Sequence, residues 1–154
     1  MPAKSAGVLA YRNKGGRLEV LLVHPGGPFW ANKDEGAWSI PKGECAASED
    51  AQAAARREFE EELGVALSRA LQPLGEIRQR GGKVVEAFAA ELDLNIEAIT
   101  SNTFEMEWPP KSGKRRSFPE VDRAAWFDLA TAREKINVAQ REFLERLEAT
   151  LHSP

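Results

Sequence analysis

Four glutamates crowd into the five residues from Glu58 to Glu62, shortly before Gly64. Gly64 predicts the end of a helix, so these acids occupy its last turns, where the helix dipole disfavours negative charge. Glutamates four residues apart on a helix also repel each other, at a cost of a few tenths of a kcal/mol. Arg56 and Arg57 offset part of this repulsion, and a bound divalent cation would offset the rest.

The helical spacing of the glutamates supports a cation site. At about 100° per residue, Glu58, Glu61 and Glu62 share roughly a third of the helix circumference, whereas Glu60 points towards water with Arg56. Three converging carboxylates form a hard-oxygen site that suits Mg²⁺ or Mn²⁺ better than Zn²⁺. The alternative for any run of glutamates is a solvated acidic face of the helix, and the residues around the run decide between the two.

The segment from Gly43 to Val65 has the spacing G-x5-E-x7-R-E-U-x-E-E-x-G-U, in which U is a bulky aliphatic residue. Phe59 stands at one aliphatic position and still predicts a buried apolar side chain. The fixed positions of the pattern are filled by Gly43, Glu49, Arg57, Glu58, Glu61, Glu62 and Gly64. This pattern is the Nudix box, and the chain resembles Nudix hydrolases from about Ser5 to Leu147, including the flanks Trp38 to Glu44 and Val121 to Leu129.

The resemblance implies an enzyme that hydrolyses a nucleoside diphosphate linked to another moiety, with Mg²⁺ or Mn²⁺ as cofactor. In the family, water attacks a phosphorus of the pyrophosphate while metals held by the box glutamates neutralise the oxygens. Carried over by position, Glu58 and Glu62 are the expected direct ligands, and Glu61 is a ligand or a base for water. The carbonyl of Gly43 is expected to add a further oxygen ligand.

Four further residues complete the predicted site. Arg57 and Glu49 are expected to orient the box glutamates without touching the metal. Glu120 is the first choice for an extra ligand or a water-activating carboxylate, because some family members use a carboxylate from a late loop; a surface carboxylate is its alternative. Lys42, beside the box glycine, is the expected contact to a substrate phosphate.

Two groups of side chains outside the box are candidates for substrate binding. Arg115 and Arg116 lie in a basic stretch with two lysines, and arginine binds phosphate in a bidentate manner. An ordinary solvated loop is the equal alternative. Trp30 is a candidate to stack on a base, as are Phe29, Phe104 and Trp108, with packing in the core as the alternative for each.

The sequence favours one substrate class only weakly. Pro41, Lys42 and Gly43 resemble the same segment of dinucleoside polyphosphate hydrolases, although those enzymes often have a tyrosine after the box and the single tyrosine here is Tyr11. ADP-ribose hydrolases often have a proline further past the box than Pro73. Two other functions stay open: a Nudix-like nucleotide-sensing module without catalysis, and an RNA 5′-end pyrophosphohydrolase.

Composition limits the class of protein. The chain has 154 residues, 42% hydrophobic and 29% charged, which predicts a single domain over residues 1–154. Its net charge of −3 makes nucleic acid an unexpected partner, and the family resemblance implies a nucleotide-derived small molecule instead. Met1 to Ser5 carries no apolar signal core, and no apolar stretch is long enough to span a bilayer, so we expect a cytoplasmic protein without a membrane partner. A homodimer stays open, and the single Cys45 excludes a disulfide framework.

The expected fold class is α/β, a Nudix-like mixed β-sheet sandwiched between helices (α/β/α). The predicted strands are Ala6 to Tyr11, Leu18 to Val23, Ala37 to Ile40, Leu74 to Gln79, Val84 to Leu92, Thr103 to Trp108 and Val121 to Phe127. One predicted helix has Ser48 as N-cap and ends at Leu63. The other runs from Thr131 to Leu151, and Pro109 to Pro119 is predicted to be a loop.

Overall fold

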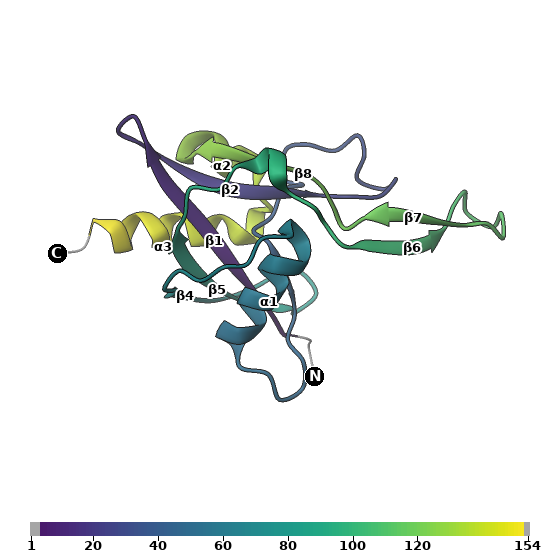
Figure 1. Cartoon of the computed structure of the whole chain (residues 1–154), viewed down its shortest axis with the longest axis horizontal. Helices are drawn as coiled ribbons and strands as arrows, with labels where there is room; N and C mark the ends of the chain where they lie inside the picture. The colour runs from purple at the N-terminus through teal and green to yellow at the C-terminus, as the bar shows by residue number, and fades with distance from the viewer. Residues whose placement is uncertain (1–3, 153–154) are drawn as a thin grey trace.

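The computed structural model describes residues 4–152 of the chain (Figure 1). Residues 1–3 and 153–154 lie outside the described part. The ends of the predicted domain over residues 1–154, and most of the stretch from Met1 to Ser5, therefore fall outside it. A six-stranded sheet forms the centre, in the order β4-β5-β1-β2-β8 with β3 paired to β1. Its strands are β1 (Lys4–Lys14), β2 (Arg17–Pro25), β3 (Lys42–Glu44), β4 (Gln72–Arg78), β5 (Val84–Glu91) and β8 (Val121–Asp128).

The central strand β1 is buried on both faces of the sheet. It pairs in parallel with β5 and antiparallel with β2 and β3, so the sheet is mixed. Alternate side chains of a strand point to opposite faces. Accordingly, Ala6, Val8 and Ala10 pack in one hydrophobic cluster and Leu9 in the other, and all four are fully buried.

Helices cover both faces of this sheet. The helix α1 (Ala51–Leu63) packs Phe59 and Leu63 into the cluster of Val8, and its Ala54 and Ala55 bring its backbone close to β1. On the opposite face lie α2 (Leu129–Lys135), the short η2 (Val138–Gln140) and α3 (Arg141–Leu151). The predicted α/β/α arrangement is confirmed. Among residues 4–152, no helix is long and apolar enough to cross a membrane.

The helix α1 begins two residues later than predicted. Asp50, not Ser48, is its N-cap, because the Asp50 carboxylate accepts a hydrogen bond from the backbone N–H of Ala53 at 3.2 Å. Glu49 lies before the helix, and its carboxylate accepts from the N–H of Ala46 at 3.0 Å. Glu49 therefore stabilises the turn before the helix, and Asp50 caps the first turn of the helix itself.

The prediction of a strand over Ala37 to Ile40 is wrong. Only two isolated bridges form there, between Trp38 and Ile136 and between Ser39 and Val23. The segment changes its partner from one residue to the next, so no ladder develops. Regular pairing starts three residues later, where β3 joins β1.

The prediction of a loop over residues 109–119 is wrong in its second half. Arg115–Pro119 forms β7, which pairs antiparallel with β6 (Thr103–Glu107) in a separate two-stranded sheet. Phe104 lies opposite Phe118 on one face of this hairpin. Aromatic cross-strand pairs stabilise antiparallel strands, and they outweigh the polar composition of the segment.

The single helix predicted from Thr131 to Leu151 is also wrong. The chain leaves the helical path at Ile136, and the side chain of Asn137 caps the following turn by accepting from the N–H of Ala139 at 3.0 Å. The N–H of Asn137 donates instead to the Trp38 carbonyl at 2.7 Å. Four apolar side chains of this segment are nevertheless fully buried: Ile136, Phe143, Leu144 and Leu147.

The predicted C-terminal end of α1 at Leu63 is confirmed. Gly64 follows with a left-handed φ of 71°, and its N–H donates to the Glu60 carbonyl at 2.7 Å. A Cβ on Gly64 would lie 2.7 Å from the carbonyl oxygen of Thr100. Both the backbone conformation and the close neighbour therefore require glycine.

We predict that Gly64→Ala lowers the free energy of unfolding by about 2–3 kcal/mol, because the φ penalty of about 1–2 kcal/mol adds to a clash with Thr100. Gly15→Ala is the matched control: its φ is 60°, but an added Cβ there meets nothing within 4 Å. Urea denaturation measures both variants. Equal losses would show that crowding at Thr100 contributes nothing.

Candidate active site

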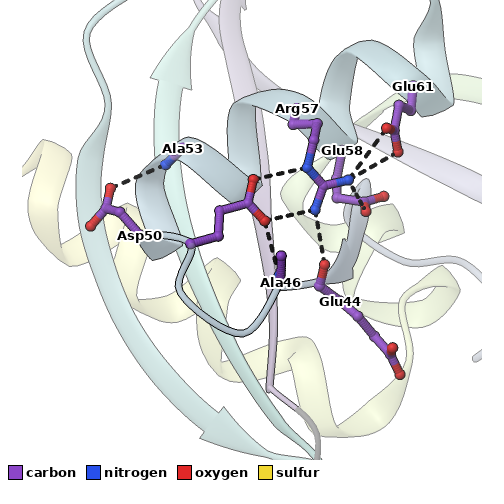
Figure 2. Close-up of polar contacts among 8 residues, drawn as sticks. Glu44, Ala46, Asp50, Ala53, Arg57, Glu58 and Glu61 are labelled. Atoms are coloured by element: carbon purple, nitrogen blue, oxygen red, sulfur yellow. Dashed lines mark hydrogen bonds and ion pairs between the residues drawn. The ribbon is translucent and has the colours of Figure 1, made fainter.

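Arg57 on α1 organises the charges of the predicted site (Figure 2). Its guanidinium donates through Nε and Nη2 to the two oxygens of Glu49, both at 2.9 Å. Nη1 donates to Glu58 at 2.8 Å and to both oxygens of Glu61 at 3.2 and 3.3 Å. Nη2 also donates to the Glu44 carbonyl at 3.0 Å, at the end of β3. One side chain thus ties three carboxylates and the strand together.

Glu49 fixes Arg57 in this position. The bidentate pair with Arg57, followed by the N–H of Ala46, lowers the pKa of Glu49 to about 2. The Arg57 pKa is in turn raised, chiefly by its hydrogen bond to Glu49. The pair stays ionised at any physiological pH, so the orientation of Arg57 does not depend on pH in that range.

Glu58 lies directly against the backbone of Gly43. A Cβ on Gly43 would fall 2.0 Å from the carboxyl carbon of Glu58, so no other residue fits at position 43 without moving that carboxylate. The Glu58 side chain is 13% exposed. Burial raises its pKa, against the opposing hydrogen bond from Arg57.

Glu62 is the buried acid of the site. The residue is 9% exposed, and its Oε2 has no hydrogen-bond partner. Burial, followed by the charge of Glu58, raises the pKa of Glu62 to about 8, and the backbone N–H of Lys42 opposes this by donating to the carboxylate. A buried carboxylate oxygen without a partner is costly and calls for a missing ligand.

Glu62 opens into a cavity of about 130 Å³, which Lys42 and Glu120 also line. Lys42 comes from the start of β3, and burial followed by the charge of Lys83 lowers the pKa of its ammonium. Glu120 lies between β7 and β8, and its charge contributes to the raised pKa values of Glu58 and Glu62. The structure therefore brings Lys42 and Glu120, which lie far from each other in sequence, to the buried glutamate.

Glu61 faces a different part of the surface. It lines a neighbouring groove with Arg57, Gly64 and Asn102, and its side chain is 39% exposed. In the part of the chain from Lys4 to His152, no three carboxylate, histidine or cysteine side chains lie close enough together to form a ready-made metal group. The predicted convergence of Glu58, Glu61 and Glu62 on one metal stays a prediction: Arg57 Nη1 bonds both Glu58 and Glu61, and Glu62 is the one of the three that lines the cavity.

The substrate-binding candidates outside the box do not line this cavity. Arg115 and Arg116 sit on opposite faces of the β6–β7 hairpin: Arg115 pairs with Glu105 at 3.8 Å, whereas the Arg116 guanidinium lies 5.8 Å from the Phe118 ring. Trp30 lies in the loop after β2 and is 41% exposed.

Gln140 is a residue that the sequence analysis missed. Its side chain is buried in η2, where Oε1 accepts from the N–H of Ile40 at 3.0 Å and Nε2 donates to Ser39 and Gln79, both at 3.1 Å. These bonds fix the segment that leads into Lys42. No sequence signal marked Gln140, because its importance arises only from the break in the predicted last helix.

A family model described as the NUDIX domain matches residues 1–147. The chain belongs to the Nudix family. The predicted family is therefore confirmed, and with it the activity class, hydrolysis of a phosphoric anhydride bond. No curated protein matches the chain significantly.

Solved structures of Nudix proteins share this fold. An Ap4A hydrolase from C. elegans is 23% identical, with 98% of this chain and 99% of that chain covered at a TM-score of 0.66. The NUDIX domain of Shewanella oneidensis NrtR, complexed with ADP ribose, is 17% identical, with 98% and 89% covered at a TM-score of 0.69. A MutT protein from Methanosarcina mazei Go1 is 19% identical, with 99% and 97% covered at 0.65.

The Nudix glutamates of this chain fit a divalent cation. Nudix hydrolases generally need Mg²⁺ or Mn²⁺. Here the unpartnered Oε2 of Glu62 and the desolvated carboxylate of Glu58 supply hard oxygen donors next to the cavity. A cation would give the Glu62 Oε2 a partner and would neutralise the repulsion between the carboxylates of Glu62 and Glu58.

We predict that Glu62→Gln stabilises the metal-free protein at pH 8 but hardly at pH 5. The Glu62 pKa rises from an ordinary value of 4.5 to about 8 on folding. The folded state then binds more protons than the unfolded state, and stability falls as the pH rises through this window. Glutamine does not ionise, so the variant does not lose this free energy of unfolding. The loss in the wild type is about 1.4 kcal/mol for each unit by which folding raises the pKa.

Urea denaturation at the two pH values, in the presence of a chelator, measures this difference. Adding Mg²⁺ should reverse the order at pH 8, because the cation stabilises the wild type and not the variant. If the free energies of unfolding of the wild type and the variant differed by the same amount at pH 5 and pH 8, a buried, ionisable Glu62 would be contradicted.

Proposed function

We propose that this Nudix protein is a divalent-metal-dependent pyrophosphohydrolase that cleaves a nucleoside diphosphate linked to another moiety, with dinucleoside polyphosphates as the favoured class. The observation that carries the proposal is the unpartnered carboxylate oxygen of Glu62 at the wall of a cavity that Lys42 and Glu120 also line. An acid is kept there at a cost in stability, which indicates selection for a ligand rather than for folding.

Glu62 and Glu58 are the residues that would hold Mg²⁺ or Mn²⁺, with the carbonyl of Gly43 as a further oxygen donor. When bound, the cation neutralises the charge on the pyrophosphate oxygens and so lowers the barrier to attack by water. The absence of a side chain at Gly43 lets a phosphate or a cation approach the backbone beside Glu58. Glu61 would join the metal ligands once its bonds to Arg57 lengthen.

Charged residues around the cavity would position the reacting groups. Lys42 donates hydrogen bonds to a phosphate oxygen from the cavity wall. Glu120 accepts a proton from the attacking water, because its carboxylate lines the same cavity and comes from a different segment than the metal-binding glutamates. Arg57 acts indirectly, by holding Glu58 in place through the 2.8 Å bond. The water oxygen forms its bond to phosphorus as the bond from phosphorus to the bridging oxygen breaks.

Two observations support the substrate class. The C. elegans protein of the same fold is an Ap4A hydrolase, and the segment Pro41 to Gly43 before the box resembles that branch of the family. The basic side chains of β7 and of the turn before it would suit a longer polyphosphate. They also keep an RNA 5′ end open as an alternative substrate.

We predict that Glu58→Gln and Glu62→Gln each lower kcat by more than about a hundredfold, because each removes a charge that the transition state needs. Glu60→Gln, an exposed acid on the same helix, is the matched control and should keep activity within about twofold. Product release is measured with Mg²⁺ or Mn²⁺ on diadenosine polyphosphates, ADP-ribose, nucleoside triphosphates, nucleotide sugars and a triphosphorylated RNA.

One substrate cleaved far above the others, with the loss confined to the two box variants, is the expected result. Full turnover by both variants would contradict the assigned site. Tight nucleotide binding without turnover by the wild type would favour a sensing module. Preference for the RNA, with binding that weakens steeply as salt rises, would favour the RNA 5′-end function.

A further inference from the structure

Two large aromatic side chains are exposed on the loop that follows β2. Phe29 is 62% exposed and Trp30 is 41% exposed. The loop runs past the tip of β2 beside the β6–β7 hairpin, which stands out from the body of the protein (Figure 1). The ring of Trp108, at the end of β6, packs edge-on against Phe29 with ring centres 5.6 Å apart. Phe29, Trp30 and Trp108 together are called the aromatic surface below.

The loop that presents the aromatic surface is held rigidly from below. Fully buried His24 lies with Nε2 2.6 Å from the carbonyl of Lys33 and with Nδ1 2.8 Å from Asp122. Asp34 accepts from the indole N–H of Trp38 at 2.8 Å and pairs with Lys135. These contacts anchor the loop on the side away from the exposed rings. Rigidly held exposed aromatics are typical of binding surfaces.

The aromatic surface is connected directly to the catalytic cavity. The N–H of Gly26 donates to the carbonyl of Glu120 at 2.9 Å. Phe29 follows Gly26 by three positions, so their Cα atoms lie at most about 11 Å apart. The hairpin that carries Trp108 begins at Asn102 and closes at Glu120, whose N–H donates to the Asn102 carbonyl at 2.8 Å. A phosphate chain held at the glutamates could therefore deliver a second ring to this surface.

Two cations lie near aromatic rings in this region, one at the aromatic surface and one on the hairpin. The ammonium of Lys33 lies 5.3 Å from the Trp30 ring, and the guanidinium of Arg116 lies 5.8 Å from the Phe118 ring on the hairpin. Aromatic rings interleaved with cations match a ligand in which a base follows a charged phosphate chain. A purely apolar partner would leave these charges without a complement.

We propose that the aromatic surface stacks on the second base of the substrate while the polyphosphate lies at the box glutamates. The inference rests on the proposed function and extends it, because it selects a substrate with an aromatic base at each end of the phosphate chain over one with a single base. Trp30 and Phe29 are the stacking residues, and Trp108 supports Phe29 from the hairpin.

The test compares diadenosine tetraphosphate with adenosine tetraphosphate, which has the same number of phosphates and one base fewer. Trp30→Ala and Phe29→Ala should each lower kcat/KM for the two-base substrate by about tenfold, the effect of losing one base–aromatic stack. Activity on the one-base substrate should change by less than about twofold. Trp30→Phe keeps a ring and should restore most of the loss. Leu151→Ala, another exposed apolar residue on α3, is the matched control.

Equal losses on both substrates, or no loss on either, would overturn the second-base site. If the wild type cleaves neither substrate, calorimetric titration of both nucleotides separates the two proposals. Tighter binding of the two-base nucleotide that weakens about tenfold in Trp30→Ala would keep the stacking site and reject the hydrolytic function. Equal binding of the two nucleotides would reject the stacking site as well.

Discussion

The crowding of like charges at the C-terminal end of α1 is the constraint around which this protein is built. Arg57 relieves it for Glu58 and Glu61 through hydrogen bonds, and Glu49 fixes Arg57 in turn. Lys42 opposes it in part for Glu62, but no hydrogen bond within the described residues reaches the buried Oε2 of Glu62. The ion pairs thus leave one carboxylate oxygen without a partner, and Glu62 lines the cavity that Lys42 and Glu120 also line.

The sheet and the C-terminal segment support this arrangement from below. Small side chains at Ala54 and Ala55 let α1 lie close to β1, and β3 brings Gly43 against Glu58. On the other face of the sheet, Gln140 fixes the backbone of Ile40 ahead of β3. The same framework positions the loop and the hairpin that leave the cavity. The box glutamates and the proposed recognition surface are therefore parts of one scaffold.

The sequence predicted what depends on local spacing. It identified the family and the end of α1 before Gly64, because motif spacing and glycine conformation act within a few residues. It failed where distant partners decide. The break at Asn137 depends on Trp38, and β7 depends on pairing with β6. The burial of Glu62 could not be predicted either, because it depends on how α1 packs and not on the sequence around Glu62.

Calorimetric titration of the protein with Mn²⁺, in buffers of different ionisation enthalpy, tests most directly whether Glu62 is a cation ligand. At pH 7 the buried carboxyl, with its pKa of about 8, is largely protonated and must lose its proton to bind a cation. We predict the release of about one proton per bound ion at pH 7, much less at pH 9.5, and none in Glu62→Gln. Binding without proton release at pH 7, or unchanged release in the variant, would contradict the assignment.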